Sequence, residues 1–408
     1  MEGTRLLHTL RLANFLSYGP EGTEIELEPL NVLIGPNGSG KSNLIEAIGL
    51  LKAAPGDLSA PIRSGGGMRE WLWKGSGKAN PSPLEVNATV SYDKGVMPLR
   101  YRLQLAPNAE QVLVWDEAIE NEAPQSPSHD DVYFFYRYQN GHPVLNVSEQ
   151  YPGSSSLGGS RGHQRQLRRE DIDPRQSILS QRKDPDLYPE LTYLADVLSR
   201  IYVFRNTNIG PESPLRGPQR ADQAGSFLLE GGGNLGLVLS NLLNRSDTRT
   251  LILEKLKRFC AFVEGISARI DAARVEIGLH EQGLTEATPS TRLSDGTLRY
   301  LCLLTILCHP NPPPLVCIED PEIGLHPDIL PVLAELLIEA SQKMQLIVTT
   351  HSDVLVSSLG EVPEAVVICE KDEEGSHLKR LEPDRLTDWL EKYTLGTLWE
   401  MGELGGNP

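Results

Sequence analysis

An eight-residue glycine-rich segment near the N-terminus limits the possible folds of this chain more than anything else in it. Gly35-Pro-Asn-Gly-Ser-Gly-Lys-Ser42 matches the pattern G-x-x-x-x-G-K-[ST], which cradles phosphate groups when a strand precedes it and a helix follows it. Residues 23–34 end in an apolar run typical of a strand, and residues 42–53 carry apolar side chains at helical spacing. The segment therefore predicts a P-loop within an α/β fold.

The residue types of this segment each suit the binding of a nucleoside triphosphate. Glycines let the backbone bend so that successive N–H groups, with the helix N-terminus, hold phosphate oxygens. We expect Lys41 to reach the β- and γ-phosphates and Ser42 to ligate Mg²⁺. A glycine-rich turn without a ligand is the alternative. The predicted binding residues are Asn37, Gly38, Ser39, Gly40, Lys41 and Ser42.

Two adjacent acids follow a second apolar run. Residues 315–322 read Leu-Val-Cys-Ile-Glu-Asp-Pro-Glu, which is typical of a buried strand that ends in Glu319 and Asp320. A strand tip places its first carboxylate where it can hold Mg²⁺, and the next residue can face the water that attacks the γ-phosphate. We predict Glu319 as the metal ligand and Asp320 as the general base. Two solvated carboxylates at a strand end are the alternative.

Four segments, in a fixed order, carry a family resemblance. They resemble the strand ahead of the P-loop, the L-S-G-G-Q signature, the D-E-P-E-x-x-L-H-P segment and the switch-histidine strand of certain ATP-binding-cassette ATPases. These are the ATPases of the RecF, structural-maintenance-of-chromosomes and overcoming-lysogenization-defect type. The C-terminal residues 395–406 also resemble a stand-alone prokaryotic predicted-ATPase subgroup. The four segments are Leu12-Ala-Asn-Phe-Leu-Ser17, Leu293-Ser-Asp-Gly-Thr297, Glu319-Asp-Pro-Glu-Ile-Gly-Leu-His-Pro327 and Leu346-Ile-Val-Thr-Thr-His351-Ser.

The resemblance implies an ATPase that uses ATP and Mg²⁺, yields ADP and phosphate, and works as an ATP-dependent homodimer. In these proteins two heads sandwich two nucleotides, and the signature helix of one subunit caps the γ-phosphate held by the other. Here Ser294 and the Gly296 amide would supply that cap, as helix-terminal N–H groups do for anions. His351 would contact the γ-phosphate and the attacking water; a neutral structural histidine is the alternative.

Three departures from the family pattern affect the predicted chemistry. The acid order is Glu-Asp rather than Asp-Glu, so the base Asp320 is one methylene shorter, which favours slow hydrolysis. The signature has Asp295 in place of its first glycine and Thr297 in place of glutamine. No convincing glutamine loop is found.

The long spacing between the motifs predicts additional structure. Lys41 and Glu319 are 319 − 41 = 278 residues apart, far more than a minimal nucleotide-binding lobe needs. Short β-type segments predict an antiparallel extension at about 84–137, and helices near 187–200, 234–245 and 248–264 precede one strand near 268–280. The predicted fold is an ATP-binding-cassette head, with a mixed sheet flanked by helices. The expected domains are a discontinuous head at 1–150 and 285–408, and an inserted, mostly helical subdomain at 151–284 with a mobile loop at 152–185.

Composition restricts the partners. The 38 Lys and Arg against 55 Asp and Glu give a net charge of −17, which argues against a surface that coats nucleic acid. One stretch, 161–183, has seven basic and three acidic residues, or +4, and is a candidate contact for nucleic acid or an acidic partner; a solvated loop is the alternative.

No signal peptide and no apolar run of ~18 residues is found, which predicts a cytoplasmic protein without a membrane contact. The five cysteines lack C-x-x-C spacing and are expected to be reduced thiols.

Together with the motifs, the resemblance implies an ATPase that acts as a sensor or clamp in prokaryotic anti-phage defence or DNA metabolism, with a separately encoded effector. Only 408 − 351 = 57 residues follow His351, too few for the nuclease domain of ~100 residues that overcoming-lysogenization-defect proteins append. Two alternatives stay open: an ATP-locked scaffold that barely hydrolyses, and the nucleotide-binding subunit of a membrane transporter, which the long insertion disfavours. The trigger and any assembly above the dimer are not predicted.

Overall fold

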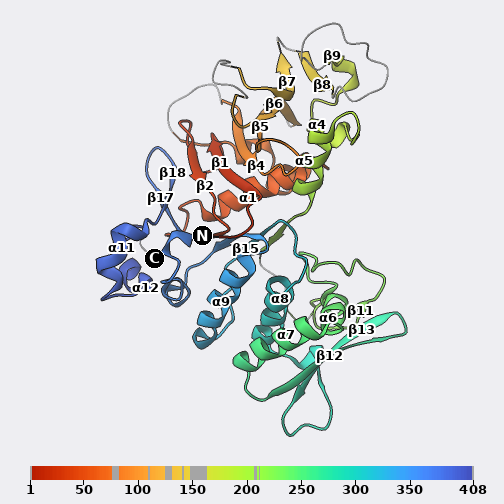
Figure 1. Ribbon diagram of the computed structural model, residues 1–408, viewed down its shortest axis with the longest axis vertical. Helices are drawn as coiled ribbons and strands as arrows, with labels where there is room; N and C mark the ends of the chain where they lie inside the picture. The colour runs from red at the N-terminus through yellow and green to blue at the C-terminus, as the bar shows by residue number, and fades with distance from the viewer. Residues whose placement is uncertain are drawn as a thin grey trace.

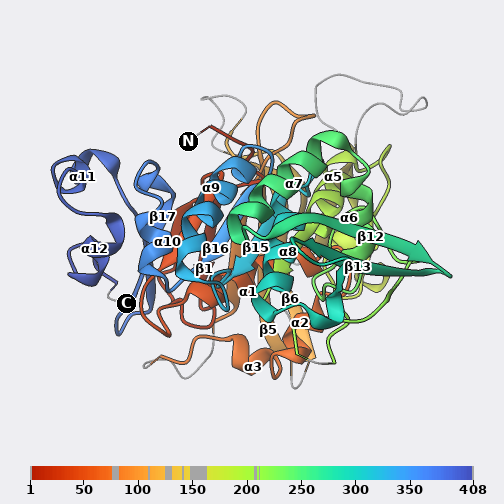
Figure 2. The same ribbon diagram turned by 90° about the horizontal axis from the view of Figure 1, so that it is seen from below.

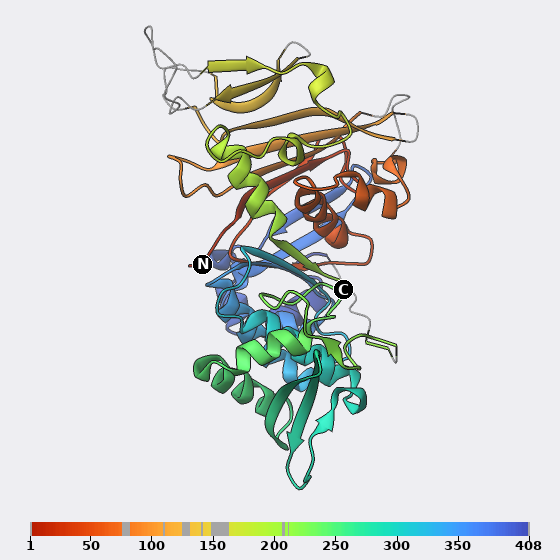
Figure 3. The same ribbon diagram turned by 90° about the vertical axis from the view of Figure 1, so that its right-hand side faces the viewer.

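The molecule is elongated and built from stacked layers. A computed structural model describes residues 2–75, 82–108, 111–124, 131–139, 142–147, 163–205, 209–210 and 212–406. An eight-stranded sheet lies at one end, a six-stranded sheet in the middle, and helices with a smaller sheet at the other end (Figures 1 and 3). Residues 152–162 of the expected mobile loop lie outside the described residues.

The middle layer is a mixed sheet in the order β10-β15-β16-β3-β17-β18, in which only β18 runs antiparallel. Its parallel strands are almost wholly apolar because helices cover both faces. Parallel strands end at the same edge of a sheet, so the segments that follow β3, β15, β16 and β10 meet there. The strands are β10 (Ile201–Phe204), β15 (Leu315–Glu319), β16 (Gln345–Thr349), β3 (Leu30–Ile34), β17 (Val366–Lys371) and β18 (Ser376–Arg380).

Successive side chains of β15 enter two different cores. Leu315 and Cys317 belong to a core with helices α1 (Lys41–Ala53) and α5 (Pro189–Ser199). Val316 and Ile318 belong to a core with α8 (Asp295–Leu307) and α9 (Leu330–Ser341). A strand alternates its side chains between faces, so the P-loop helix α1 and the signature helix α8 cover opposite faces of the middle sheet.

The eight-stranded sheet is antiparallel and confirms the predicted β extension. One face packs on α1, α2 (Ser59–Ser64) and α4 (Ile178–Gln181), and α3 (Met68–Trp71) lies at its side. The strand expected at 23–34 is two strands in different sheets, separated by Leu27-Glu-Pro29. The sheet consists of β2 (Thr23–Glu26), β1 (Leu7–Ala13), β4 (Leu84–Val90), β5 (Leu99–Asn108), β6 (Gln111–Asn121), β7 (Phe134–Gln139), β8 (His142–Val147) and β9 (His163–Gln166).

A β-hairpin lies at the opposite end (Figure 3), and it projects outward in the view from below (Figure 2). The single strand predicted near 268–280 was wrong: β12 (Val263–Asp271) and β13 (Arg274–Glu281) pair antiparallel around Ala272 and Ala273. Both alanines have positive φ, 45° and 63°, which a two-residue hairpin turn requires and which glycine or asparagine usually supplies. The strands β11 (Gln219–Arg220) and β14 (Thr288–Pro289) flank β13, and α6 (Leu235–Leu243) and α7 (Ser246–Phe259) pack on the hairpin.

The segment 151–284 contains α4, α5, α6 and α7, and it also contains β10 of the middle sheet and the hairpin. Its boundaries as a subdomain stay a prediction. The C-terminal part adds α10 (Asp353–Ser357), α11 (Pro383–Leu390) and α12 (Leu395–Glu400).

All five cysteines are free, four of them buried, as expected. No helix in the described ranges is long and apolar enough to span a membrane.

Candidate nucleotide site

The P-loop turns tightly between β3 and α1. Gly35 has φ 141°, and a Cβ atom there would lie 2.2 Å from the carbonyl oxygen of Cys369 on β17, so only glycine fits. The Lys41 side chain is buried and folds back over the loop, where Nζ donates to the carbonyl oxygens of Gly35 (2.6 Å) and Pro36 (3.1 Å). Burial lowers the pKa of Lys41, while Cys369, Asp320 and Glu322 raise it. The predicted base therefore lies near the P-loop lysine.

The loop is braced from the segment after β1, and its polar groups suit a phosphate ligand. Tyr18 donates its hydroxyl to the Gly40 carbonyl oxygen (3.0 Å), and Asn43 Nδ2 donates to Ser17 Oγ (2.7 Å). Ser39 Oγ is buried and has no hydrogen-bond partner among the described residues. A hydroxyl left without a partner in a glycine-rich turn can donate to a phosphate oxygen. Asn37, Gly38 and Ser42 are exposed at the mouth of the loop.

Glu319 ends β15 on the same face as Cys317, which is the face that α1 covers. Its Oε1 is buried without a hydrogen-bond partner among the described residues, and Arg205 Nε lies 3.6 Å away. Burial raises the pKa of Glu319, and Arg205 opposes this shift. A buried carboxylate oxygen that lacks a hydrogen-bond donor, on the sheet face that α1 covers, fits a Mg²⁺ ligand, with the Ser42 hydroxyl as its companion.

The backbone turns away from the direction of β15 at Asp320. It has φ 44°, a left-handed conformation that is uncommon for residues other than glycine. Its N–H donates to the Thr349 carbonyl oxygen (3.1 Å), and Thr349 Oγ1 donates to Asp320 Oδ1 (3.1 Å). The carboxylate is therefore held at the end of β16, next to the switch segment.

Glu322, to which the sequence analysis assigned no role, links two segments. These are the loop that follows β15 (the acid loop) and the segment around His351 that follows β16 (the switch segment). Its Oε1 accepts hydrogen bonds from the His351 N–H (2.8 Å) and the Thr350 hydroxyl (2.7 Å). Its Oε2 is buried without a hydrogen-bond partner among the described residues, and burial raises the pKa of this carboxyl group. The His351 side chain is exposed at this edge. The P-loop, the acid pair and His351 therefore lie at the same edge of the middle sheet.

The signature residues lie at the start of helix α8, on the other face of the middle sheet from α1. Ser294 caps α8, and its Oγ accepts a hydrogen bond from the Thr297 N–H (3.1 Å). A Cβ atom on Gly296 would lie 2.6 Å from the Gly324 carbonyl oxygen, so the helix start packs closely on the acid loop. Because α8 covers the face opposite α1, Ser294 and Gly296 belong to a different helix layer from the P-loop of the same chain.

Arg205 is a second residue that the sequence did not indicate. It directly follows β10, which pairs with β15, and its Nη1 donates to Glu46 of α1 (2.5 Å) while Nε faces Glu319. The available signal was the short apolar run Ile201-Tyr-Val-Phe204 after a helix, which indicates a buried strand. Residues 206–208 lie outside the described part of the chain, and the glutamine loop is not assigned.

The basic stretch 161–183 stays a prediction as a nucleic-acid contact. Arg175 pairs with Asp173 (2.8 Å), and Lys183 and Arg182 donate to carbonyl oxygens of Pro55 (2.9 Å) and Asp171 (3.0 Å). The side chains of Arg161, Arg165 and Arg169 lie outside the described residues. Three of the described cations are therefore bonded within the chain.

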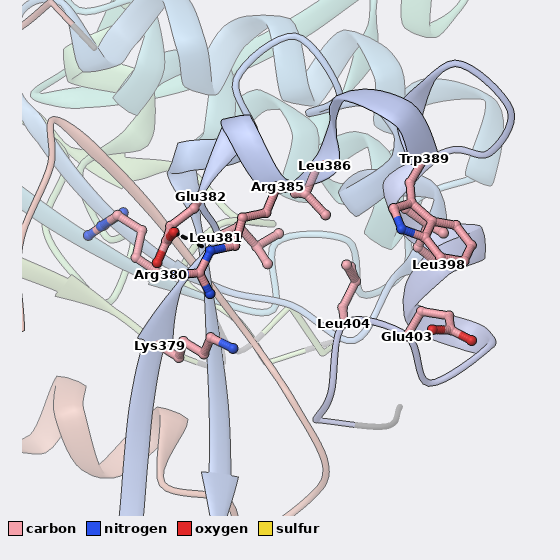
Figure 4. A pocket seen from close by; sticks show the side chains of 10 residues that line it. All are labelled: Lys379, Arg380, Leu381, Glu382, Arg385, Leu386, Trp389, Leu398, Glu403 and Leu404. Atoms are coloured by element: carbon pink, nitrogen blue, oxygen red, sulfur yellow. Dashed lines mark ion pairs between the residues drawn. The ribbon is translucent and has the colours of Figure 1, made fainter.

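A separate cavity of ≈ 190 Å³ lies between β18, α11 and α12 (Figure 4). Leu381, Leu386 and Trp389 line it, and Glu382 pairs with Arg385 (2.6 Å) at its rim. β18 is the far edge strand of the middle sheet, so the cavity is distinct from the acid pair at β15.

Comparisons with known proteins identify the family and the fold of this chain. A family model described as "AAA domain, putative AbiEii toxin, Type IV TA system" matches residues 30–357. The chromosome partition proteins Smc of Mycolicibacterium paratuberculosis and Rhodopirellula baltica are 31% identical over 97 residues and 34% identical over 96 residues. Each match covers 23% of this chain and only 8% of the relative.

Solved Smc heads share the fold over nearly the whole chain. The Smc head bound to the C-winged helix domain of ScpA has a TM-score of 0.56 and 16% identity, and the match covers 94% of this chain and 100% of that one. The head with an extended coiled coil, bound to the C-terminal domain of ScpA from Pyrococcus furiosus, has a TM-score of 0.54 and 15% identity and covers 95% and 99%. This chain therefore belongs to the AAA-domain family described as putative AbiEii toxin of type IV toxin–antitoxin systems, as a P-loop ATPase domain with the fold of an Smc head.

Proposed function

We propose that this chain binds and hydrolyses Mg-ATP, and that two copies associate head to head around the nucleotides. One observation carries the proposal: the P-loop, the acid pair and His351 meet at one edge of the middle sheet, while the signature helix covers the opposite face from α1. Because this signature segment is not in the same helix layer as the P-loop of its own chain, we infer that it acts at the nucleotide site of a second copy.

The residues at the edge have separable roles in this proposal. Lys41 and the backbone N–H groups of the loop hold the phosphates, and Ser42 and Glu319 hold Mg²⁺, which supplies charge neutralisation at the β- and γ-phosphates. Asp320 accepts a proton from the attacking water, and His351 orients that water and the γ-phosphate. Ser294 and the Gly296 N–H of the second copy stabilise the charge that develops on the γ-phosphate.

We further propose that ATP binding makes the head a sensor or clamp that controls a separately encoded effector, in anti-phage defence or DNA metabolism. The support is the family description, which names a toxin–antitoxin system, and the Smc-head fold. A second candidate is an ATP-locked scaffold with negligible turnover. The shorter base Asp320, and the Arg205 guanidinium that faces the metal-binding oxygen of Glu319, favour this candidate.

The decisive experiment is the molar mass of Asp320→Asn protein by light scattering, with and without Mg-ATP. We expect ATP to double the mass, and we expect the added substitution Ser294→Arg to prevent the doubling because a long cation fills the phosphate cap. Ser246→Arg, at the start of α7, is the matched control and should leave the doubling intact. A mass that does not respond to ATP would contradict the head-to-head dimer.

Turnover separates the two candidate functions. In a single-turnover assay of the wild-type protein, release of phosphate at a steady rate supports the ATPase. ATP that persists for hours within a stable dimer supports the scaffold instead.

A further inference from the structure

The signature segment is held by an arginine from a distant part of the chain. Arg216, in the loop between β10 and β11, donates from Nη1 to the Leu293 carbonyl oxygen (2.7 Å) and from Nε to the Ile209 carbonyl oxygen (2.9 Å). Its Nη2 forms an ion pair with Asp295 Oδ1. The Arg216 side chain is only 15% exposed, so the guanidinium is packed between these three partners.

The arginine is also anchored through its own backbone. Ser290 Oγ donates to the Arg216 carbonyl oxygen (2.9 Å), which joins the loop to the turn just before the signature. Leu293 and Asp295 flank Ser294, the residue proposed to cap a phosphate. Arg216 therefore contacts the signature segment on both sides of its functional serine.

Asp295 is the member of the signature that departs from the family pattern, where glycine is expected. It is the first residue of α8, and 71% of its side chain is exposed. A carboxylate in the first turn stabilises a helix, but it also repels any anion that approaches the same helix N-terminus. A phosphate cap that contains Asp295 therefore needs a cation to compensate the carboxylate.

Two of the described arginines lie near this carboxylate. Arg216 forms the direct ion pair, and Arg299 lies one turn further along α8. Burial lowers the pKa of Arg299, and Asp295 is among the groups that raise it again. Only Arg216 also bonds to the backbone of the signature.

We propose that Arg216 is a positioning residue that neutralises Asp295, and thereby allows this signature segment to accept the γ-phosphate of a nucleotide bound by a second copy. The inference rests on the head-to-head dimer of the proposed function. It assigns to the loop between β10 and β11 a part in dimerisation, in addition to the contact that Arg205, at the start of this loop, makes with Glu319 of the acid pair.

A charge-rescue experiment tests the proposal. In the Asp320→Asn background, the molar mass is followed by light scattering against Mg-ATP concentration for Arg216→Met, Asp295→Asn and the double variant. We expect Arg216→Met to raise the ATP concentration needed for dimerisation by about tenfold or more, because an uncompensated carboxylate then faces the incoming phosphates. Adding Asp295→Asn should restore dimerisation, since it removes that carboxylate.

Two controls accompany the series. Arg220→Met removes a nearby exposed arginine that pairs with Asp222, and it should behave as the parent protein. Calorimetric titration of ATP into dilute monomer should give the same affinity for parent and Arg216→Met, because the P-loop is unchanged. If Arg216→Met does not fold, Arg216→Lys keeps the charge and is expected to dimerise close to the parent.

The outcomes separate this inference from the function on which it rests. A parent protein that does not dimerise with ATP overturns both. A parent that dimerises, with an Arg216→Met variant that needs no more ATP, overturns the inference alone. The inference is also overturned if Asp295→Asn does not restore dimerisation to a folded Arg216→Met protein. Arg216 would then act only through its hydrogen bonds to backbone carbonyl oxygens. A folded Arg216→Lys protein that needs about tenfold more ATP to dimerise than the parent has the same consequence.

Discussion

Lys41 donates two hydrogen bonds to the loop whose phosphate ligand it is expected to bind. Its Nζ bonds to the Gly35 and Pro36 carbonyl oxygens, and two acids, Asp320 and Glu322, lie close enough to influence its pKa. Bound phosphates would exchange with these carbonyl oxygens as acceptors. We expect Lys41→Ala to lower kcat/KM for ATP by about 10²–10³-fold, the usual loss for one preorganised charge contact. Unchanged turnover in a folded variant would place the phosphate site elsewhere.

The identity of the base is a separate prediction at the same scale. We expect Asp320→Asn to bind ATP with nearly unchanged affinity and to release phosphate at least about 10²-fold more slowly, because the amide cannot accept the proton of water. The measurement is single-turnover phosphate release alongside equilibrium ATP binding. Comparable turnover would move the role to another acid, and Glu322, with one buried oxygen lacking a partner among the described residues, is the next to test.

A buried carboxyl group far from the site makes stability depend on pH. Burial raises the pKa of Glu117 to about 7, although Tyr101, Ser177 and the Ile178 N–H donate to its oxygens. The unfolded value is near 4.5, so between pH 4.5 and pH 7 the folded state holds more protons than the unfolded state. The free energy of unfolding therefore falls as pH rises through this window.

Glu117→Gln should remove that dependence, because the amide oxygen can still accept from Ile178 while the two hydroxyls turn to accept from the amide N–H groups. We expect the stability of the wild-type protein, relative to this variant, to fall by up to about 3 kcal/mol between pH 5 and pH 8. Urea unfolding across this range measures it, with the exposed Glu122→Gln as control. A constant difference would mean that Glu117 does not change protonation in this window.

At the scale of elements, the hairpin β12–β13 carries an identifiable strain. Ala272 and Ala273 both have positive φ, which costs roughly 1–2 kcal/mol for a residue with a Cβ. We expect Ala273→Gly to stabilise the hairpin by about 0.5–1 kcal/mol, measured by urea unfolding and by hydrogen exchange of the β12 amides. Ala268→Gly, within β12, is the matched control and should destabilise, because a strand position gains nothing from glycine. A loss of stability in both variants would contradict a left-handed turn.

Elements with strong local signals were predicted well, and those without were not. The helix expected at 42–53 is α1 (Lys41–Ala53), since the P-loop starts it and Pro55-Gly56 follows its end. The strand near 268–280 was wrong because two alanines give no turn signal. β10 was missed because four apolar residues directly after a helix do not define a strand by periodicity.

The whole molecule has its P-loop and its signature helix in different layers, which leads to a prediction about mixed dimers. Lys41→Ala damages the P-loop half of a site and Ser294→Arg the signature half. A dimer with one copy of each keeps one intact composite site, whereas each variant alone keeps none. We expect the mixture to regain turnover, up to about half of the wild-type value, since a mixed dimer has one of its two sites intact.

The control mixture combines Lys41→Ala with Asp320→Asn. Each substitution damages the P-loop half of the site in the chain that carries it. A mixed dimer therefore has no intact site, and no activity should return. Recovery in the control, or none in the test mixture, would contradict composite sites built from two copies.

The sequence by itself determined the local chemistry: the P-loop, the acid pair at a strand end and the capped signature helix are short segments whose geometry follows from neighbouring residues. The tertiary structure alone decided which of these meet and which residues support them. Glu322 reaches His351 across 29 residues, Arg216 reaches Asp295 across 79, and Arg205 reaches Glu319 across 319 − 205 = 114. These contacts depend on the order of strands in the middle sheet and on the helix layers that cover it. That order arises from packing of the whole chain, and no local pattern encodes it.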